Sequence, residues 1–121
     1  MMGVIHNSVY FHWFERGRLQ IMEEVLPFNL ALTLGVVTPV VENMCHYRRP
    51  VRFGDALLLY TTHEIQASYE GKLVFNHYLV QERQKTATAH GHTVLTFVDA
   101  ATYRLIRDWP EDVWRRYQQL A

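Results

Sequence analysis

The sequence predicts an α+β fold in which one long helix packs against an antiparallel sheet. Apolar residues recur at helical spacing between residues 8 and 26, and residues 38–99 read as four strands separated by short polar turns. A helix followed by a block of strands favours segregated layers, so the helix is expected to cover one sheet face. The length of 121 residues suits one domain, and we expect residues 1–121 to form it.

The composition excludes several classes of protein. Hydrophobic residues make up 49% of the chain and charged residues 20%, which is typical of a folded globular protein. The formal net charge is zero, so neither a nucleic-acid partner nor a membrane surface is expected. The single cysteine, Cys45, cannot form a disulfide within the chain, and no secretory or membrane-spanning pattern is found. These features together predict a soluble cytoplasmic protein.

The long helix is expected over residues 8–26, with an apolar stripe of Tyr10, Trp13, Phe14, Gly17, Ile21 and Val25. Asn7 or Ser8 can cap its start, and Pro27 marks its end. A glycine inside a helix costs about 1 kcal/mol relative to alanine. Gly17 therefore indicates either a close approach of the helix to the sheet or a simply tolerated glycine. The segment that follows is expected to be irregular up to residue 38.

Four strands are expected, at residues 38–47, 56–67, 72–83 and 86–99. In the third, Leu73, Phe75 and Leu79 alternate with apolar residues on the other face, which favours a helix on one side and a partner on the other. The last strand carries small residues on one face, at Ala87, Ala89 and Gly91. A short helix is expected from Trp109, with Pro110 in its first turn.

Two open sheet edges and one covering helix would leave apolar surface exposed. Self-association removes this surface most simply, so we expect a homodimer or a homotetramer.

Three blocks of sequence carry a family resemblance. They are residues 2–10 (MGVIHNSVY) with 13–18 (WFERGR), residues 47–55 (YRRPVRFGD) and residues 89–99 (AHGHTVLTFVD). In this order they resemble the hotdog-fold acyl-CoA thioesterases, in particular the 4-hydroxybenzoyl-CoA and Tol-Pal-associated thioesterase family. The resemblance implies a hotdog fold, hydrolysis of an acyl-CoA thioester to free acid and CoA, and no cofactor beyond the CoA thioester substrate.

One feature departs from the family pattern. The family places its catalytic Asp three residues before the glycine that corresponds to Gly3, which would fall immediately before Met1. The family's first strand would also lie further upstream. We therefore expect an N-terminally truncated chain, and a natural variant without this acid is the alternative. In the second case the protein would be a non-catalytic acyl-CoA or acyl-carrier binding protein.

Thioester hydrolysis needs an activated water or a nucleophile and stabilisation of the carbonyl oxygen. Amides at a helix start can stabilise that oxygen, which points to the helix start near Tyr10. The family's histidine corresponds to Asn7, and the neighbouring His6 titrates near neutrality and could act as acid or base. Glu15 is either a catalytic acid or an ion-pair partner of Arg18 or of a second chain. Asn7, His6, Tyr10 and Glu15 are therefore the catalytic candidates.

CoA carries phosphates, so basic residues are expected at the mouth of the site. Arg83, Lys85 and Arg104 are the candidates, with ordinary surface charge as the alternative. His90 and His92 share one strand face, and His77 in the preceding strand could lie opposite them. No metal site is expected, because no carboxylate or cysteine follows these histidines at ligand spacing.

Overall fold

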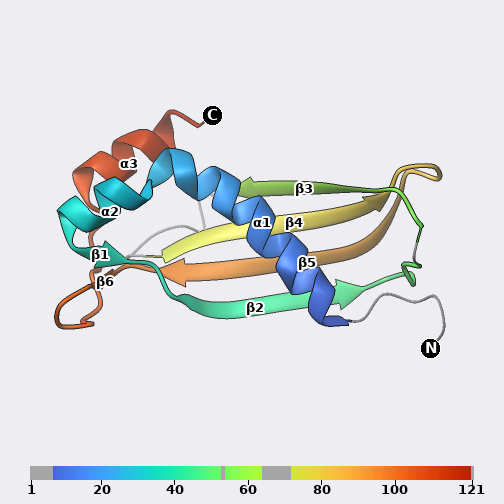
Figure 1. The fold of residues 1–121 in the computed structure, drawn as a ribbon, viewed down its shortest axis with the longest axis horizontal. Coiled ribbons are helices and arrows are strands. Elements are labelled where there is room, and N and C mark those ends of the chain that lie inside the picture. Colours follow the sequence, from blue (N-terminus) through green and yellow to red (C-terminus); the bar gives the residue numbers. More distant parts are fainter. Residues whose placement is uncertain (1–6, 53, 64–71, 121) are drawn as a thin grey trace.

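The computed structural model describes residues 7–52, 54–63 and 72–120 (Figure 1). Helix α1 (Asn7–Val25) lies across one face of a four-stranded antiparallel sheet. The strands are β2 (Val40–Tyr47), β3 (Leu57–His63), β4 (Lys72–Gln81) and β5 (Thr86–Thr96). The predicted α+β arrangement is confirmed, although the predicted end of the second strand falls on residues 64–67, outside the described residues.

The strands do not follow chain order across the sheet, which runs β2-β5-β4-β3. β3, β4 and β5 form consecutive hairpins, whereas β2 pairs with β5 and forms the edge opposite β3. The register places Cys45, Gly91, His77 and Thr61 side by side in one row, with one residue from each strand. This row lies on the sheet face that α1 covers.

The segment after α1 was expected to be irregular, and this expectation is wrong. The segment forms α2 (Phe28–Leu34), which Gly35 ends in the left-handed conformation with φ of 68°. The Gly35 N–H donates to the carbonyls of Ala31 and Leu32, a helix end that favours glycine. β1 (Val36–Val37) follows and pairs with β6 (Val98–Asp99), so the predicted last strand is interrupted at Phe97.

The predicted face of small residues on β5 is correct for Ala89 and Gly91, which are buried, and wrong for Ala87, which is exposed. The physical reason is an irregularity in the pairing with β4, where Leu79 opposes Ala89 but Val80 opposes Ala87. An extra residue in one strand shifts the facing of those beyond it.

The predicted C-terminal helix is α3 (Glu111–Gln118), with Pro110 at its N-cap. Its buried residues Val113 and Tyr117 pack at the end of α1, in a core with Met22 and Val25. Among the described residues, no helix has both the length and the apolarity needed to cross a membrane.

Gly17 marks a close approach of α1 to the sheet. A Cβ at this position would lie 2.1 Å from Thr61 Oγ1, 3.0 Å from Thr61 Cβ and 3.2 Å from Leu59 Cδ2. Of the two explanations for this glycine, close approach is therefore confirmed. The lost helix propensity is offset by tight packing of the helix on β3.

We predict that Gly17→Ala lowers the free energy of unfolding by about 1–2 kcal/mol, although alanine is the better helix former. The added methyl group would force Thr61 to move, and Thr61 is fixed by a hydrogen bond to His77. Urea unfolding measures the change. Gln20→Ala, at an exposed position of α1, is the matched control and should change stability by less than about 0.5 kcal/mol. A Gly17→Ala variant as stable as the parent would contradict the close approach.

Candidate active site at the start of the long helix

Aromatic side chains anchor the start of α1 on the sheet. Tyr10 is 2% exposed, and its ring packs edge-on against Tyr47 of β2 at 4.8 Å and against Trp13 at 5.4 Å between centroids. Val51 and Cys45 complete the surrounding cluster. The first turn of α1 is thus held in a fixed position relative to β2.

The ionisable groups near this helix start, Tyr10, Cys45 and Tyr47, have raised pKa values. Burial raises the pKa of Tyr10, with the nearby Cys45 acting in the same direction and a backbone hydrogen bond with Val51 acting against it. Burial also raises the pKa values of Cys45 and Tyr47. Near neutral pH all three groups therefore keep their protons, so they are suited to donating hydrogen bonds and not to acting as bases or thiolate nucleophiles.

The remaining catalytic candidates differ in what the structure describes. Asn7 is the first residue of α1, but its side chain, like all of His6, lies outside the described part of the chain. Glu15 is exposed on α1. Burial lowers the pKa of Arg18, and the negative charge of Glu15 opposes that shift. This interaction supports the interpretation of Glu15 as the electrostatic partner of Arg18.

Two hollows beside α1 have a largely apolar lining. One of about 310 Å³ lies beside Trp13, with Leu57, Leu59 and Leu79 as its apolar wall and Arg16 and Asp55 as polar residues. The other, of about 710 Å³, lies between the second half of α1, α2 and β1. Both offer apolar surface on which an acyl group could bind.

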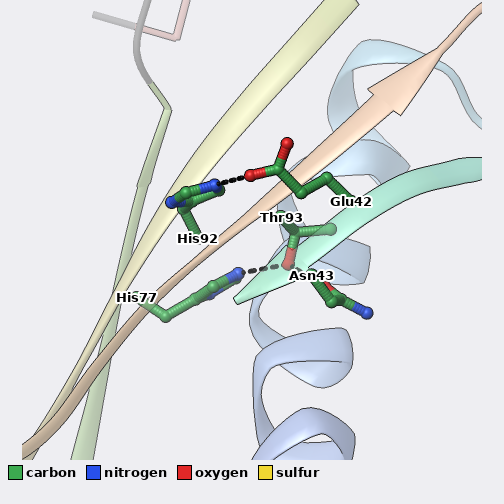
Figure 2. A network of polar contacts seen from close by, with 5 residues as sticks. All are labelled: Glu42, Asn43, His77, His92 and Thr93. Carbon is green, nitrogen blue, oxygen red and sulfur yellow. Dashed lines mark hydrogen bonds and ion pairs between the residues drawn. The ribbon is translucent and has the colours of Figure 1, made fainter. Parts of the chain in front are cut away.

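A chain of hydrogen bonds crosses the sheet beneath α1, and Figure 2 draws its members His77, Thr93 and Asn43. Thr61 Oγ1 lies 3.0 Å from His77 Nδ1, and His77 Nε2 lies 2.9 Å from Thr93 Oγ1. Thr93 Oγ1 in turn donates to Asn43 Oδ1 at 2.8 Å. The ring of His77 also stacks on Phe14 of α1, with a centroid distance of 4.5 Å and an interplanar angle of 5°. We call these four residues, Thr61, His77, Thr93 and Asn43, the polar chain.

The environment of His77 favours its neutral form. Burial, together with the positive charge of Arg18 and the neighbouring His92 and His90, lowers the pKa of His77 to about 4.

His90 and His92 share one face of the sheet, as expected, but His77 lies on the other face and not opposite them. Alternation along β4 and β5 separates them, because His77 pairs in register with Gly91, between the two. His92 Nε2 contacts Glu42 Oε1 at 2.5 Å (Figure 2), and His90 stacks on Tyr78. In the described part of the chain, no three side chains of metal-ligand type are grouped.

The basic candidates fall at two ends of the molecule. Arg83 and Lys85 are exposed in the turn between β4 and β5, at the end of the sheet toward which the first turn of α1 points (Figure 1). Arg104 is exposed in the connection between β6 and α3, at the other end. Within one chain, the structure does not bring Arg104 together with the other two.

A model of the thioesterase-like superfamily matches residues 1–116 of this sequence. The chain belongs to this superfamily. A Bacillus subtilis (strain 168) protein, "Putative acyl-CoA thioesterase YneP", is 26% identical to this thioesterase-like chain over 80 residues. That match covers 64% of the chain and 56% of YneP, so it spans little more than half of the relative.

Solved structures share the fold of this thioesterase-like chain. The hypothetical protein TT1821 from Thermus thermophilus is 30% identical with a TM-score of 0.80, and the match covers 98% of this chain and 88% of that one. The DHNA-CoA thioesterase from Staphylococcus aureus is 21% identical with a TM-score of 0.81, covering 98% and 79%. A Thermus thermophilus thioesterase complexed with coenzyme A and Zn is 21% identical with a TM-score of 0.77, covering 98% and 81%. The predicted hotdog fold is confirmed, while the narrower 4-hydroxybenzoyl-CoA and Tol-Pal-associated group stays a prediction.

The buried, hydrogen-bonded position of His77 was not predicted from the sequence. A signal was present, because His77 occupies an inward position of β4 between Phe75 and Leu79. A histidine that interrupts an apolar alternation is buried with it and needs hydrogen-bond partners. Those partners, Thr61 and Thr93, come from two other strands, so the strand order was needed to find them.

We predict that His77 makes the protein less stable as the pH falls from about 6.5 to 4. Above this window the imidazole is neutral in the folded and the unfolded protein. Within it, the imidazole is protonated in the unfolded chain but stays neutral in the folded protein. The free energy of unfolding should therefore decrease as the pH is lowered through this window, by roughly 3 kcal/mol in total from this group. Urea unfolding at several pH values measures this slope.

His77→Gln should remove this component of the slope, whereas His12→Gln, at an exposed position of α1, should retain it. An unchanged slope in His77→Gln would show that other groups cause the acid sensitivity.

Proposed function

We propose that this protein hydrolyses acyl-CoA thioesters to a free carboxylic acid and CoA. The observation that carries the proposal is the anchored start of α1 in a chain of the thioesterase-like superfamily. The first amide N–H groups of a helix have no partner within the helix, and the helix dipole adds positive potential around them. They are suited to binding the thioester carbonyl oxygen as it gains negative charge.

The remaining chemistry falls to side chains near this helix end. His6 could remove a proton from the attacking water or donate one to the leaving thiolate, since an ordinary histidine titrates near neutrality. Asn7 could orient that water through its amide. Tyr10 keeps its proton, so its contribution would be a neutral hydrogen bond or support of the helix start. Glu15 would act through the charge of Arg18.

The CoA phosphates would meet Arg83 and Lys85, which lie at the same end of the sheet as the helix start (Figure 1). The acyl group would occupy the hollow beside Trp13. In this proposal no bound cofactor or metal takes part in the reaction.

We predict that the protein releases CoA from one or more members of a panel of short, long and aromatic acyl-CoAs, followed with a thiol-reactive dye. Removal of a general acid or base typically costs about 10²–10⁴-fold. We expect His6→Ala or Asn7→Ala to lower kcat by about 10²-fold or more, and Glu15→Gln by less than tenfold. Turnover only after the upstream residues are restored would show truncation, whereas binding of acyl-CoA without turnover by that longer chain would contradict the proposal and favour the non-catalytic binding protein.

The same assay tests the phosphate contacts. Arg83→Ala and Lys85→Ala should each raise KM a few-fold, since one exposed ion pair is worth up to about 1 kcal/mol. Arg104→Ala, at the other end of the sheet, is the matched comparison. Equal effects from all three variants would contradict this placement.

We further propose that the protein forms a homodimer or a homotetramer. Large apolar side chains are exposed around the groove of α1, α2 and β1, with Phe28 at 75% and Leu32 at 65%. The outer edge of β2 has no strand beside it among the described residues. A second copy of the chain would cover this surface. Because the formal net charge of each chain is zero, the two copies would not repel each other through net charge.

Light scattering coupled to size exclusion should therefore report a mass of two or four chains. Leu32→Glu should lower that mass because it places a charge in the apolar surface, whereas Gln118→Glu, at an exposed position of α3, should not. A monomeric parent protein would contradict the association.

A further inference from the structure

His77 is a buried titratable group that the proposed reaction does not use. Its side chain is fully buried, yet both ring nitrogens have hydrogen-bond partners, Thr61 on β3 and Thr93 on β5. A histidine in an apolar core is costly unless both nitrogens are satisfied. The arrangement of its partners defines which nitrogen carries the proton.

The hydrogen bonds of Thr93 settle the direction of the polar chain. Thr93 has one hydroxyl hydrogen, and it donates that hydrogen to Asn43 Oδ1. Toward His77 it can therefore only accept, so His77 Nε2 must carry the proton. Nδ1 of a neutral ring is then an acceptor, and Thr61 Oγ1 donates to it. All the donors point the same way, from β3 through β4 and β5 to β2.

The polar chain contacts α1 at two neighbouring turns. The His77 ring lies flat against Phe14, and Phe14 in turn packs on Gly91, where an added Cβ would come within 2.5 Å of its ring. One turn later, Thr61 lies directly beneath Gly17. A shift of His77 or Thr61 would therefore be transmitted to the first half of α1, since neither contact leaves free space.

We infer that His77, as the neutral tautomer with its proton on Nε2, is a positioning residue that fixes the start of α1 on the sheet. This inference rests on the proposed function for its consequence, because the helix start is where the thioester carbonyl would bind. His77 itself touches neither the substrate nor the reacting atoms. It acts through Phe14 and through the four strands that the polar chain connects.

Protonation of His77 would reverse the hydrogen bond between Thr61 and the ring. A charged ring donates from both nitrogens, and Thr61 would then have to accept the bond that it now donates. Two kinds of charged or titratable group surround the ring: Arg18 on α1, and His90 and His92 on β5 behind the sheet. Each of these disfavours a positive charge on the ring, and no carboxylate in the described part of the chain is among the groups that shift the pKa of His77.

Two substitutions separate the ring from its hydrogen bonds. His77→Phe keeps an aromatic ring against Phe14 but removes both bonds, and His77→Gln keeps one donor and one acceptor without the ring. We expect His77→Phe to lower kcat at least tenfold with less than a threefold change in KM, and His77→Gln to recover part of that loss. A purely structural role would lower the unfolding temperature and leave kcat unchanged in the folded variant, and that result would overturn the inference.

Nitrogen NMR of the imidazole tests the tautomer without any substrate. The expected spectrum has a protonated Nε2 and an unprotonated Nδ1 for His77, and His77→Phe should shift the amide signals of residues 9–14 in α1. A ring protonated on Nδ1, or unshifted α1 amides in His77→Phe, would overturn the inference. If neither the parent protein nor a form with the upstream residues restored released CoA while both NMR results were as expected, the proposed function would fail and the positioning of the helix would stand.

Discussion

The close packing of the first half of α1 on the sheet is the constraint on which the rest of the structure depends. It requires Gly17 over Thr61 and Gly91 under Phe14, because at both places a Cβ would collide with the opposing element. These two glycines belong to opposite layers, so neither the helix nor the sheet alone explains them. With them in place, the rings of Tyr10 and Phe14 can reach β2, β4 and β5.

The packing divides the interior into two apolar clusters. One surrounds the start of α1, with Tyr10 and Leu79 among its members, and the other joins the end of α1 to α3, with Phe75 and Tyr117. The buried members of the polar chain lie between them, since His77 stands between Phe75 and Leu79 on β4. Satisfied buried polar groups give directional contacts that apolar side chains lack. The helix start is thereby fixed in position as well as in distance from the sheet.

A fixed helix start matters for the proposed chemistry. Amide donors stabilise a developing oxyanion best when they already point at its position. Reorienting them during the reaction would cost free energy and so reduce the stabilisation of the transition state. Arg18 and Glu15 lie further along the same helix, so charges there can affect the site without direct contact. The structure therefore separates residues that would touch the substrate from residues that hold the helix in place.

Much of this arrangement could be predicted from the sequence. The stripe from Tyr10 to Val25 and the alternation along β4 are local patterns, and both predicted the correct inward residues. α2 could not be predicted because its apolar run has no clear periodicity, and its end depends on Gly35. The pairing of β2 with β5 and the irregularity near Ala87 depend on contacts between distant segments. For the same reason the polar chain became visible only once three strands were aligned beside His77.

Native-state hydrogen exchange at the start of α1 tests the central claim most directly. Helix ends commonly exchange through local fraying, at a lower free energy than the core of a sheet. If the close packing fixes the helix start, the amides of residues 11–17 should exchange with the same opening free energy as those of residues 75–79 in β4. Exchange of residues 11–17 at a clearly lower free energy would show that the helix start opens independently and would contradict the account.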